Sequence, residues 1–161
     1  MVGKVGLQTT TFPSIVRAIS QSSIGQIMVV IGMVVAEFNR PITERMEDAA
    51  KQIAKDRGAT VIDTIYVPGV YDAPIAADRL ARRDDVDAVV VIGAIISGET
   101  DHEHVIAHAA AQGLIKISLN RDKPVALGIT GPGMDPKQAV DRIENGGFAM
   151  ESAIKMVERI S

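Results

Sequence analysis

The sequence predicts an α/β fold in which a parallel β-sheet is covered by helices on both faces. Residues 88–96 are apolar apart from one glycine, which is typical of a central strand that is buried on both sides. Three further strand-like segments alternate with segments that show helical spacing or helix-capping signals. This alternation is typical of parallel strands joined by right-handed crossover helices. The expected strands are residues 27–36, 60–67, 88–96 and 125–130.

The expected helices follow these strands in order. The first, residues 41–57, has Pro41 in its first turn and Gly58 just beyond its end. Its apolar face consists of Ile42, Met46, Ala49, Ala50 and Ile53. Two further helices are expected at residues 73–83 and 102–119.

The C-terminal part of the chain is expected to contain two more helices. Asp135 followed by Pro136 predicts an N-cap with proline in the first helical position, and Gln138 completes a capping box. The glycines at positions 146 and 147 are expected to break that helix, so that the last helix covers residues 148–160.

The positions of the connecting loops predict where a ligand would bind. Four parallel strands joined in this way favour a flavodoxin-like three-layer sandwich with strand order 2-1-3-4. In such sheets ligands bind at the carboxyl ends of the strands, in the crevice where the strand order reverses. That crevice lies between the first and third strands. The segments that leave the four strands at this rim are residues 37–39, 69–72, 97–102 and 130–133.

The N-terminal part of the chain differs from this regular series. We expect residues 1–26 to form an extension and residues 27–161 to form the α/β domain. Residues 9–12 are rich in strand formers, so the extension is either a leader or an added edge strand on this or a neighbouring subunit. The apolar run 27–36 also resembles a signal-peptide core, but cleavage after it would delete the first strand, so we interpret it as a strand.

Composition and charge exclude several classes of function. The formal net charge is −3, and no Lys/Arg cluster is interleaved with aromatic residues, so no nucleic-acid partner is expected. The absence of cysteine excludes disulfides and thiolate chemistry and fits a cytoplasmic location. The longest apolar run has ten residues, too few to span a bilayer, so no membrane association is expected.

Three residues at the expected rim have side chains suited to binding or catalysis. Phe38 lies between a strand and a helix, where it would stack on a flat heteroaromatic ring or cap the core below the loop. Asp72 ends a proline-rich turn, where its carboxylate would bind a polyol or cap the following helix. His102 falls in the first turn of a helix and is either a proton-transfer residue or an exposed side chain without a role.

The segment before His102 is expected to bind an oxyanion. Thr100 and Glu103 have the spacing of a capping box, and the first N–H groups of a helix have no intrahelical partner. Such N–H groups suit phosphate. His104 and His108 lie one turn apart on the same helix, but they do not form the His-Glu-x-x-His zinc pattern, so no metal is assigned.

Four segments of the chain resemble those of a known enzyme family. They are Ala-Glu-Phe-Asn at 36–39, Val-Pro-Gly-Val-Tyr-Asp-Ala-Pro at 67–74, Gly-Glu-Thr-x-His at 98–102, and Lys-Pro-Val-Ala-Leu-Gly at 123–128 followed by Gly-Pro-Gly-Met at 131–134. In content and order they resemble the 6,7-dimethyl-8-ribityllumazine synthases of riboflavin biosynthesis. The last segment is most similar to the archaeal branch of that family.

The resemblance implies a transferase that needs no cofactor. It would condense 5-amino-6-(D-ribitylamino)uracil with 3,4-dihydroxy-2-butanone 4-phosphate to 6,7-dimethyl-8-ribityllumazine. His102 would move protons in this reaction. The residues implied in substrate binding are Phe38, Val70, Tyr71, Asp72, Ala94, Ile95, Glu99, Thr100, Leu127 and Arg142.

The resemblance also implies an oligomer. In the family, residues at the positions of Leu127 and Arg142 act at the site of a neighbouring subunit, so the chain should form a ring, a pentamer, which can build into an icosahedral 60-mer. This sequence departs from the family pattern at Asp72, where glutamate is usual, and at Leu127, where many relatives have phenylalanine. The lysine that follows Arg142 in the family is also absent, because glycines 146 and 147 and Phe148 occupy that region.

Two other functions are compatible with the same residues. One is an archaeal-type riboflavin synthase, which shares the fold. The other is a non-catalytic flavin-binding or cage-forming protein, which the absent lysine favours. The fold alone does not distinguish these functions from the synthase.

Overall fold

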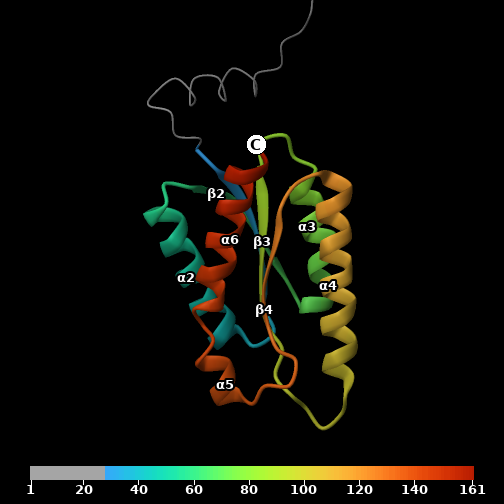
Figure 1. Cartoon of the computed structure of the whole chain (residues 1–161). Coiled ribbons are helices and arrows are strands. Elements are labelled where there is room, and N and C mark those ends of the chain that lie inside the picture. Colours follow the sequence, from blue (N-terminus) through green and yellow to red (C-terminus); the bar gives the residue numbers. More distant parts are fainter. Residues whose placement is uncertain (1–27) are drawn as a thin grey trace, which may run out of the picture.

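Four parallel strands form the sheet of the computed structural model, which describes residues 28–161 (Figure 1). The strands are β1 (Val30–Ala36), β2 (Thr60–Val67), β3 (Ala88–Ala94) and β4 (Val125–Thr130). Their order is β2-β1-β3-β4, so the predicted fold class and strand order are confirmed. The extension expected at residues 1–26 lies outside the described residues.

The two central strands are almost wholly apolar because helices cover both of their faces. All seven residues of β3 are buried, and so are six of the seven in β1. The run that resembles a signal-peptide core thus contains a central strand, which pairs with both β2 and β3. Both strands are shorter than the apolar runs that predicted them, because Val29 and Ile95, just outside the strands, are also buried in the core.

Helices cover the sheet in two layers (Figure 1). α2 (Arg40–Asp56) and α6 (Asn145–Ile160) pack together on one face, and α3 (Ala73–Ala81) and α4 (His102–Arg121) pack together on the other. A 3₁₀ turn, η1 (Val70–Asp72), precedes α3, and the short α5 (Pro136–Val140) lies near the carboxyl end of the sheet, at the bottom of Figure 1. Alternate residues of β3 face the two layers, so each layer has its own aliphatic core.

The start of α5 is formed by the predicted capping box. The Asp135 carboxylate accepts the N–H of Gln138 at 2.7 Å, and the Gln138 side chain accepts the N–H of Asp135 at 3.0 Å. Pro136 occupies the first helical position, where its missing N–H leaves no backbone partner unsatisfied. The prediction made from these three residues is confirmed.

The predicted helix break at the two glycines is wrong. α5 already ends at Val140, and α6 begins at Asn145 with Gly146 and Gly147 in its first turn. A Cβ atom on Gly146 would lie 2.1 Å from the carbonyl oxygen of Met46, on α2. The glycine is therefore a packing residue, because only a residue without a side chain lets the two helix backbones approach this closely.

The outer surface of α4 is unusually apolar. Of its 20 residues only Ala110 and Leu114 are buried. Val105, Ile115 and Leu119 are 64%, 56% and 75% exposed. A helix with apolar residues around its circumference commonly packs on more than one neighbour, and here one chain covers a single side of it. None of the helices within residues 28–161 combines the length and apolar character needed to cross a membrane.

Candidate active site

The loops at the carboxyl ends of the strands are held together by backbone hydrogen bonds. The N–H groups of Glu37 and Phe38 donate to the carbonyls of Val67 and Pro68 at 2.8 and 3.0 Å, which extends the β1–β2 pairing beyond the strands. On the other side, the Ile95 N–H donates to the Thr130 carbonyl at 2.8 Å. The segments that follow the four strands therefore form one continuous rim, at the lower end of Figure 1.

The ring of Phe38 is 72% exposed at this rim. The next residue, Asn39, has a left-handed conformation with φ 62°, and its amide Nδ2 donates to the carbonyl of Ala94 at 2.8 Å. That bond ties the loop after β1 to the end of β3. The exposure of Phe38 leaves its ring free for stacking and excludes the alternative in which it caps the core.

The turn after β2 places Val70, Tyr71 and Asp72 next to Phe38 along the rim. Val70 is buried and packs so closely on β3 that a Cβ on Gly93 would lie 2.7 Å from Val70 Cγ2. Tyr71 is 67% exposed. The Asp72 oxygen Oδ2 accepts the N–H of Gly69 at 3.0 Å, so the carboxylate closes the 3₁₀ turn and makes no capping bond to α3.

The loop after β3 connects the core to the exposed start of α4. Ala94 and Ile95 are 2% and 7% exposed, so their side chains belong to the core. Glu99 and Thr100 are exposed, and no other described residue forms a hydrogen bond or ion pair with them. Their backbone amides are therefore available to a ligand.

Glu103 stabilises this loop from the first turn of α4. Its carboxylate accepts a long hydrogen bond of 3.5 Å from the Gly98 N–H and a second one from the Ser97 hydroxyl. Partial desolvation raises the pKa of Glu103, but these hydrogen bonds outweigh it and hold the pKa below its ordinary value. The predicted capping box with Thr100 is wrong, because the Glu103 side chain extends back to Gly98 and the helix begins after Asp101.

His102 is the first residue of α4, as predicted, and it is exposed at the rim. His104 and His108 lie further along the helix, with ring centroids 6.4 Å apart. Within residues 28–161, no group of three or more His, Asp or Glu side chains is arranged to hold a metal ion.

Leu127 and Arg142, the two residues expected to act at a neighbour's site, lie in different parts of the chain. Leu127 is 53% exposed in the middle of the edge strand β4, with β3 between β4 and β1. Arg142 is exposed in the turns between α5 and α6, where its guanidinium donates to the Gln138 carbonyl at 3.0 Å. The rim of one chain thus brings together Phe38, the turn 70–72, the loop 97–101 and His102, whereas Leu127 lies further back on the sheet.

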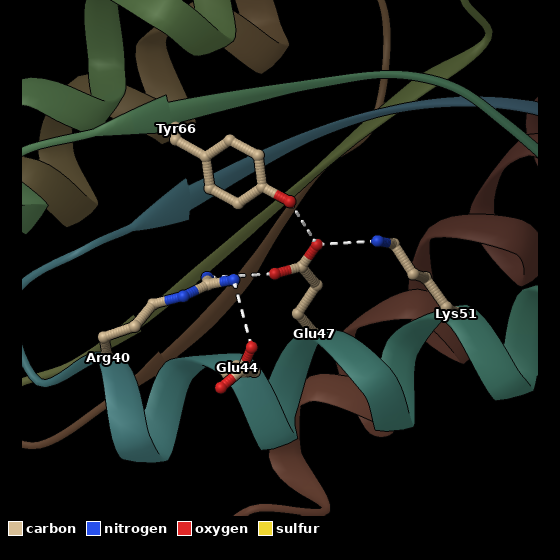
Figure 2. Close-up of polar contacts among 5 residues, drawn as sticks. All are labelled: Arg40, Glu44, Glu47, Lys51 and Tyr66. Atoms are coloured by element: carbon tan, nitrogen blue, oxygen red, sulfur yellow. Dashed lines mark hydrogen bonds and ion pairs between the residues drawn. The ribbon is translucent and has the colours of Figure 1, made fainter.

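Sequence reasoning missed a buried carboxylate close to the rim, shown in Figure 2. The Glu47 side chain on α2 is only 3% exposed. Its Oε2 accepts from Arg40 Nη1 at 3.0 Å, and its Oε1 accepts from Lys51 Nζ and Tyr66 Oη, both at 2.7 Å. We call these four residues the Glu47 network. The available signal was the helical spacing of Arg40, Glu47 and Lys51, which are seven and four residues apart, but nothing local indicated Tyr66.

The Glu47 network keeps its carboxylate ionised. Burial raises the pKa of Glu47, but the hydrogen bonds from Lys51, Tyr66 and Arg40 together outweigh burial and lower the pKa. The hydrogen bond to Glu47, with desolvation, raises the pKa of the Tyr66 hydroxyl. The Arg40 guanidinium also lies over the Tyr66 ring, 5.1 Å from its centroid.

The chain is a flavodoxin-like α/β protein, because it has an open parallel sheet whose strand order reverses between β1 and β3. Aromatic and polar residues lie at the rim of the sheet at that point, which is therefore the candidate active site. Residues 28–161 match the family described as 6,7-dimethyl-8-ribityllumazine synthase. The chain therefore belongs to this family, as its sequence motifs predicted.

Several archaeal proteins that carry the same name are similar to the chain. One from Halobacterium salinarum is 56% identical over 130 residues, which are 81% of this chain and 98% of that protein. One from Halorubrum lacusprofundi is 54% identical over 133 residues, 83% of this chain and 99% of the relative. One from Methanocaldococcus jannaschii is 51% identical over 134 residues, 83% of this chain and 95% of the relative.

Proposed function

We propose that the chain condenses 5-amino-6-(D-ribitylamino)uracil with 3,4-dihydroxy-2-butanone 4-phosphate to 6,7-dimethyl-8-ribityllumazine, with release of phosphate and water. The observation that carries this proposal is the position of three family-like segments. Phe38, the turn 70–72 and the loop 98–102 leave the ends of three neighbouring strands at one rim. A ligand as large as the lumazine can therefore contact all three segments. The name of the family and of the archaeal relatives supports the same reaction.

The pyrimidine substrate would bind between Phe38 and the turn 70–72. The exposed Phe38 ring stacks on the flat heterocycle, and the buried Ala94 and Ile95 form the floor beneath it. The ribityl chain bonds to the backbone of Val70 and Tyr71 and to Asp72. Oδ1 of Asp72 is bonded to no other described residue, so it can accept a ribityl hydroxyl while Oδ2 keeps its bond to Gly69.

The second substrate would bind through its phosphate. The amides of Glu99 and Thr100 precede the N-terminus of α4, where the helix dipole favours an anion. Arg142 of a neighbouring subunit supplies a guanidinium, which matches phosphate oxygens in a bidentate fashion. Because the family's lysine is absent here, the two amides and the Arg142 guanidinium bind the phosphate without a second side-chain cation.

His102 would move the protons that the condensation requires. The amine of the pyrimidine attacks the ketone, and water leaves as the imine forms. Phosphate is then eliminated, and the ring closes with loss of a second water. Each step transfers a proton, and imidazole serves as both acceptor and donor near neutral pH. Orientation of the two substrates supplies most of the rate increase, so the imidazole is a modest contributor.

The site would be completed by a second copy of the chain in a pentameric ring. Leu127 lies roughly 10 Å back along β4 from the rim and roughly 10 Å across the sheet from β1, too far to cover a ring stacked on Phe38 of its own chain. The exposed apolar residues of α4 support subunit contacts. Such rings can assemble further into an icosahedral shell. We place the enzyme in the cytoplasm.

Turnover with both substrates tests the proposed function. The chain should form the lumazine, detected by its fluorescence, and His102→Ala should lower kcat about 100-fold while both KM values stay within about twofold. No product from the unmodified chain would contradict the proposal. Riboflavin formed from the lumazine alone would indicate a riboflavin synthase. Flavin binding without turnover, unchanged in His102→Ala, would indicate a binding protein.

A further inference from the structure

The Glu47 network connects the two rim segments that are proposed to hold the pyrimidine substrate. Arg40 directly follows Phe38 and Asn39 and begins α2. Tyr66 is the last residue but one of β2, directly before the Val67 and Pro68 carbonyls that accept from the loop after β1. Figure 2 shows the Glu47 carboxylate bonded to both of these residues, with Lys51 on its other side.

The contacts within the network are short and directional. Separate oxygens of Glu47 bind Arg40 and Tyr66, at 3.0 and 2.7 Å. The carboxylate is almost completely buried, so water reaches these bonds only from the side of the partly exposed Arg40 and Tyr66. Arg40 is also stacked on the Tyr66 ring. A shift of the first turn of α2 relative to the end of β2 would break at least one of these contacts.

This arrangement specifies a geometry in addition to any contribution to stability. Apolar residues of similar volume often stabilise a protein as well as a buried ion pair does. Arg40 is also a cation in the first turn of a helix, where the helix dipole disfavours positive charge. What a charged network supplies, and an apolar contact lacks, is one defined geometry for the groups that it joins.

We propose that Glu47 is a positioning residue for the pyrimidine-binding half of the active site, and this inference rests on the proposed function. Through Arg40 and Tyr66, Glu47 sets the position of the Phe38 ring relative to the turn 70–72. No hydrogen bond or ion pair joins residues 97–101 to the four residues of the network, so binding of the second substrate should not depend on it.

Kinetics of three variants test this role. Glu47→Gln removes the charge, Tyr66→Phe removes only the hydroxyl that donates to Glu47, and Lys51→Met is the matched control. Lys51 donates to the same carboxylate at the same 2.7 Å, but it lies one turn further from the rim on α2. We measure kcat and both KM values, together with unfolding by urea so that every assay is made on folded protein.

A positioning role predicts a change in one kinetic constant. Glu47→Gln and Tyr66→Phe should raise the KM of the pyrimidine substrate about three- to tenfold and leave the KM of the phosphate substrate unchanged. Lys51→Met should change stability but neither KM. Equal effects on both KM values, an equal effect of Lys51→Met, or unchanged KM values in all three variants would overturn the inference while turnover itself still supports the proposed function. Absence of turnover in the unmodified chain would instead remove the proposed function and this inference with it.

Discussion

At the scale of a single residue, substitution of the exposed Phe38 should change substrate binding without changing the stability of the fold. Because the ring is 72% exposed, Phe38→Ala should leave the free energy of unfolding within about 0.5 kcal/mol of the unmodified chain. The loss of stacking should raise the KM of the pyrimidine substrate about tenfold. Steady-state kinetics and urea unfolding measure the two effects.

Phe148 offers a matched control for this substitution. It is also a phenylalanine and is 68% exposed, but it lies on α6. Phe148→Ala should leave the KM of the pyrimidine substrate unchanged. If both alanine variants raised that KM equally, Phe38 would have no specific stacking role.

The ionised carboxylate of Glu47 should make stability depend on pH. Its pKa in the folded chain lies below the ordinary value of 4.5. Above that value both the folded and unfolded states are ionised, and the stabilisation is complete. As the pH falls below 4.5 the unfolded state binds the proton first, so the stabilisation is lost as the pH approaches the lower folded pKa.

Comparison of the unmodified chain with Glu47→Gln isolates this contribution. The difference in their free energies of unfolding should be about 1–3 kcal/mol at pH 7 and should shrink as the pH falls below 4.5. Urea unfolding at several pH values measures it. A difference that stayed constant down to pH 3 would show that the charge of Glu47 does not stabilise the fold.

At the scale of elements, the contact between α2 and α6 depends on one glycine. A methyl group on Gly146 would meet the Met46 carbonyl at 2.1 Å, and backbone atoms cannot move aside as a flexible side chain can. Gly146→Ala should therefore lower the free energy of unfolding by about 1–3 kcal/mol. Urea or thermal unfolding measures this change.

The neighbouring glycine is the control for this prediction. A Cβ on Gly147 would lie 3.2 Å from Cγ1 of Ile53, a side-chain atom that can shift. The better helix propensity of alanine, worth about 1 kcal/mol, should offset the crowding. Gly147→Ala is therefore expected to be nearly neutral. Equal destabilisation by both substitutions would mean that the Met46 contact is not the cause.

At the scale of the whole molecule, the proposed ring makes a site from two chains. His102→Ala and Arg142→Ala rings should each have little activity, because every site lacks one group. Rings reassembled from an equal mixture should regain activity at about one quarter of their sites, where an intact His102 faces an intact Arg142. Assays of the two pure variants and of the reassembled mixture measure this recovery.

Two observations would contradict the shared site. A solution mass equal to the 17.1 kDa of one chain would exclude a ring, whereas a pentamer has five times that mass. Mixed rings without recovered activity would place both groups in the same chain's site. Analytical ultracentrifugation and the mixing assay are therefore measured on the same samples.

Much of the fold was determined by local properties of the sequence. Apolar runs and turn residues predicted the bounds of β2 and β4 as observed, and the N-terminal residue of α4. The strand order followed from the general rules of parallel sheets, and it placed Phe38, Asp72 and His102 at one rim. These predictions succeed because strand periodicity, helix caps and crossover handedness depend on residues that are close in the chain.

Only the tertiary structure decided the contacts between distant segments. Local signals predicted a helix break at the two glycines, but both lie in the first turn of α6. There Gly146 packs against Met46, 100 residues earlier in the chain. The spacing of residues along α2 identified only the apolar face of this helix, whereas the burial of Glu47 and its bond to Tyr66 arise only when β2 pairs with β1 beneath it. The sequence by itself thus determined the elements and the rim where their loops meet. The packing of those elements decided which side chains are buried and which partners hold them, because burial depends on residues that are far apart in the chain.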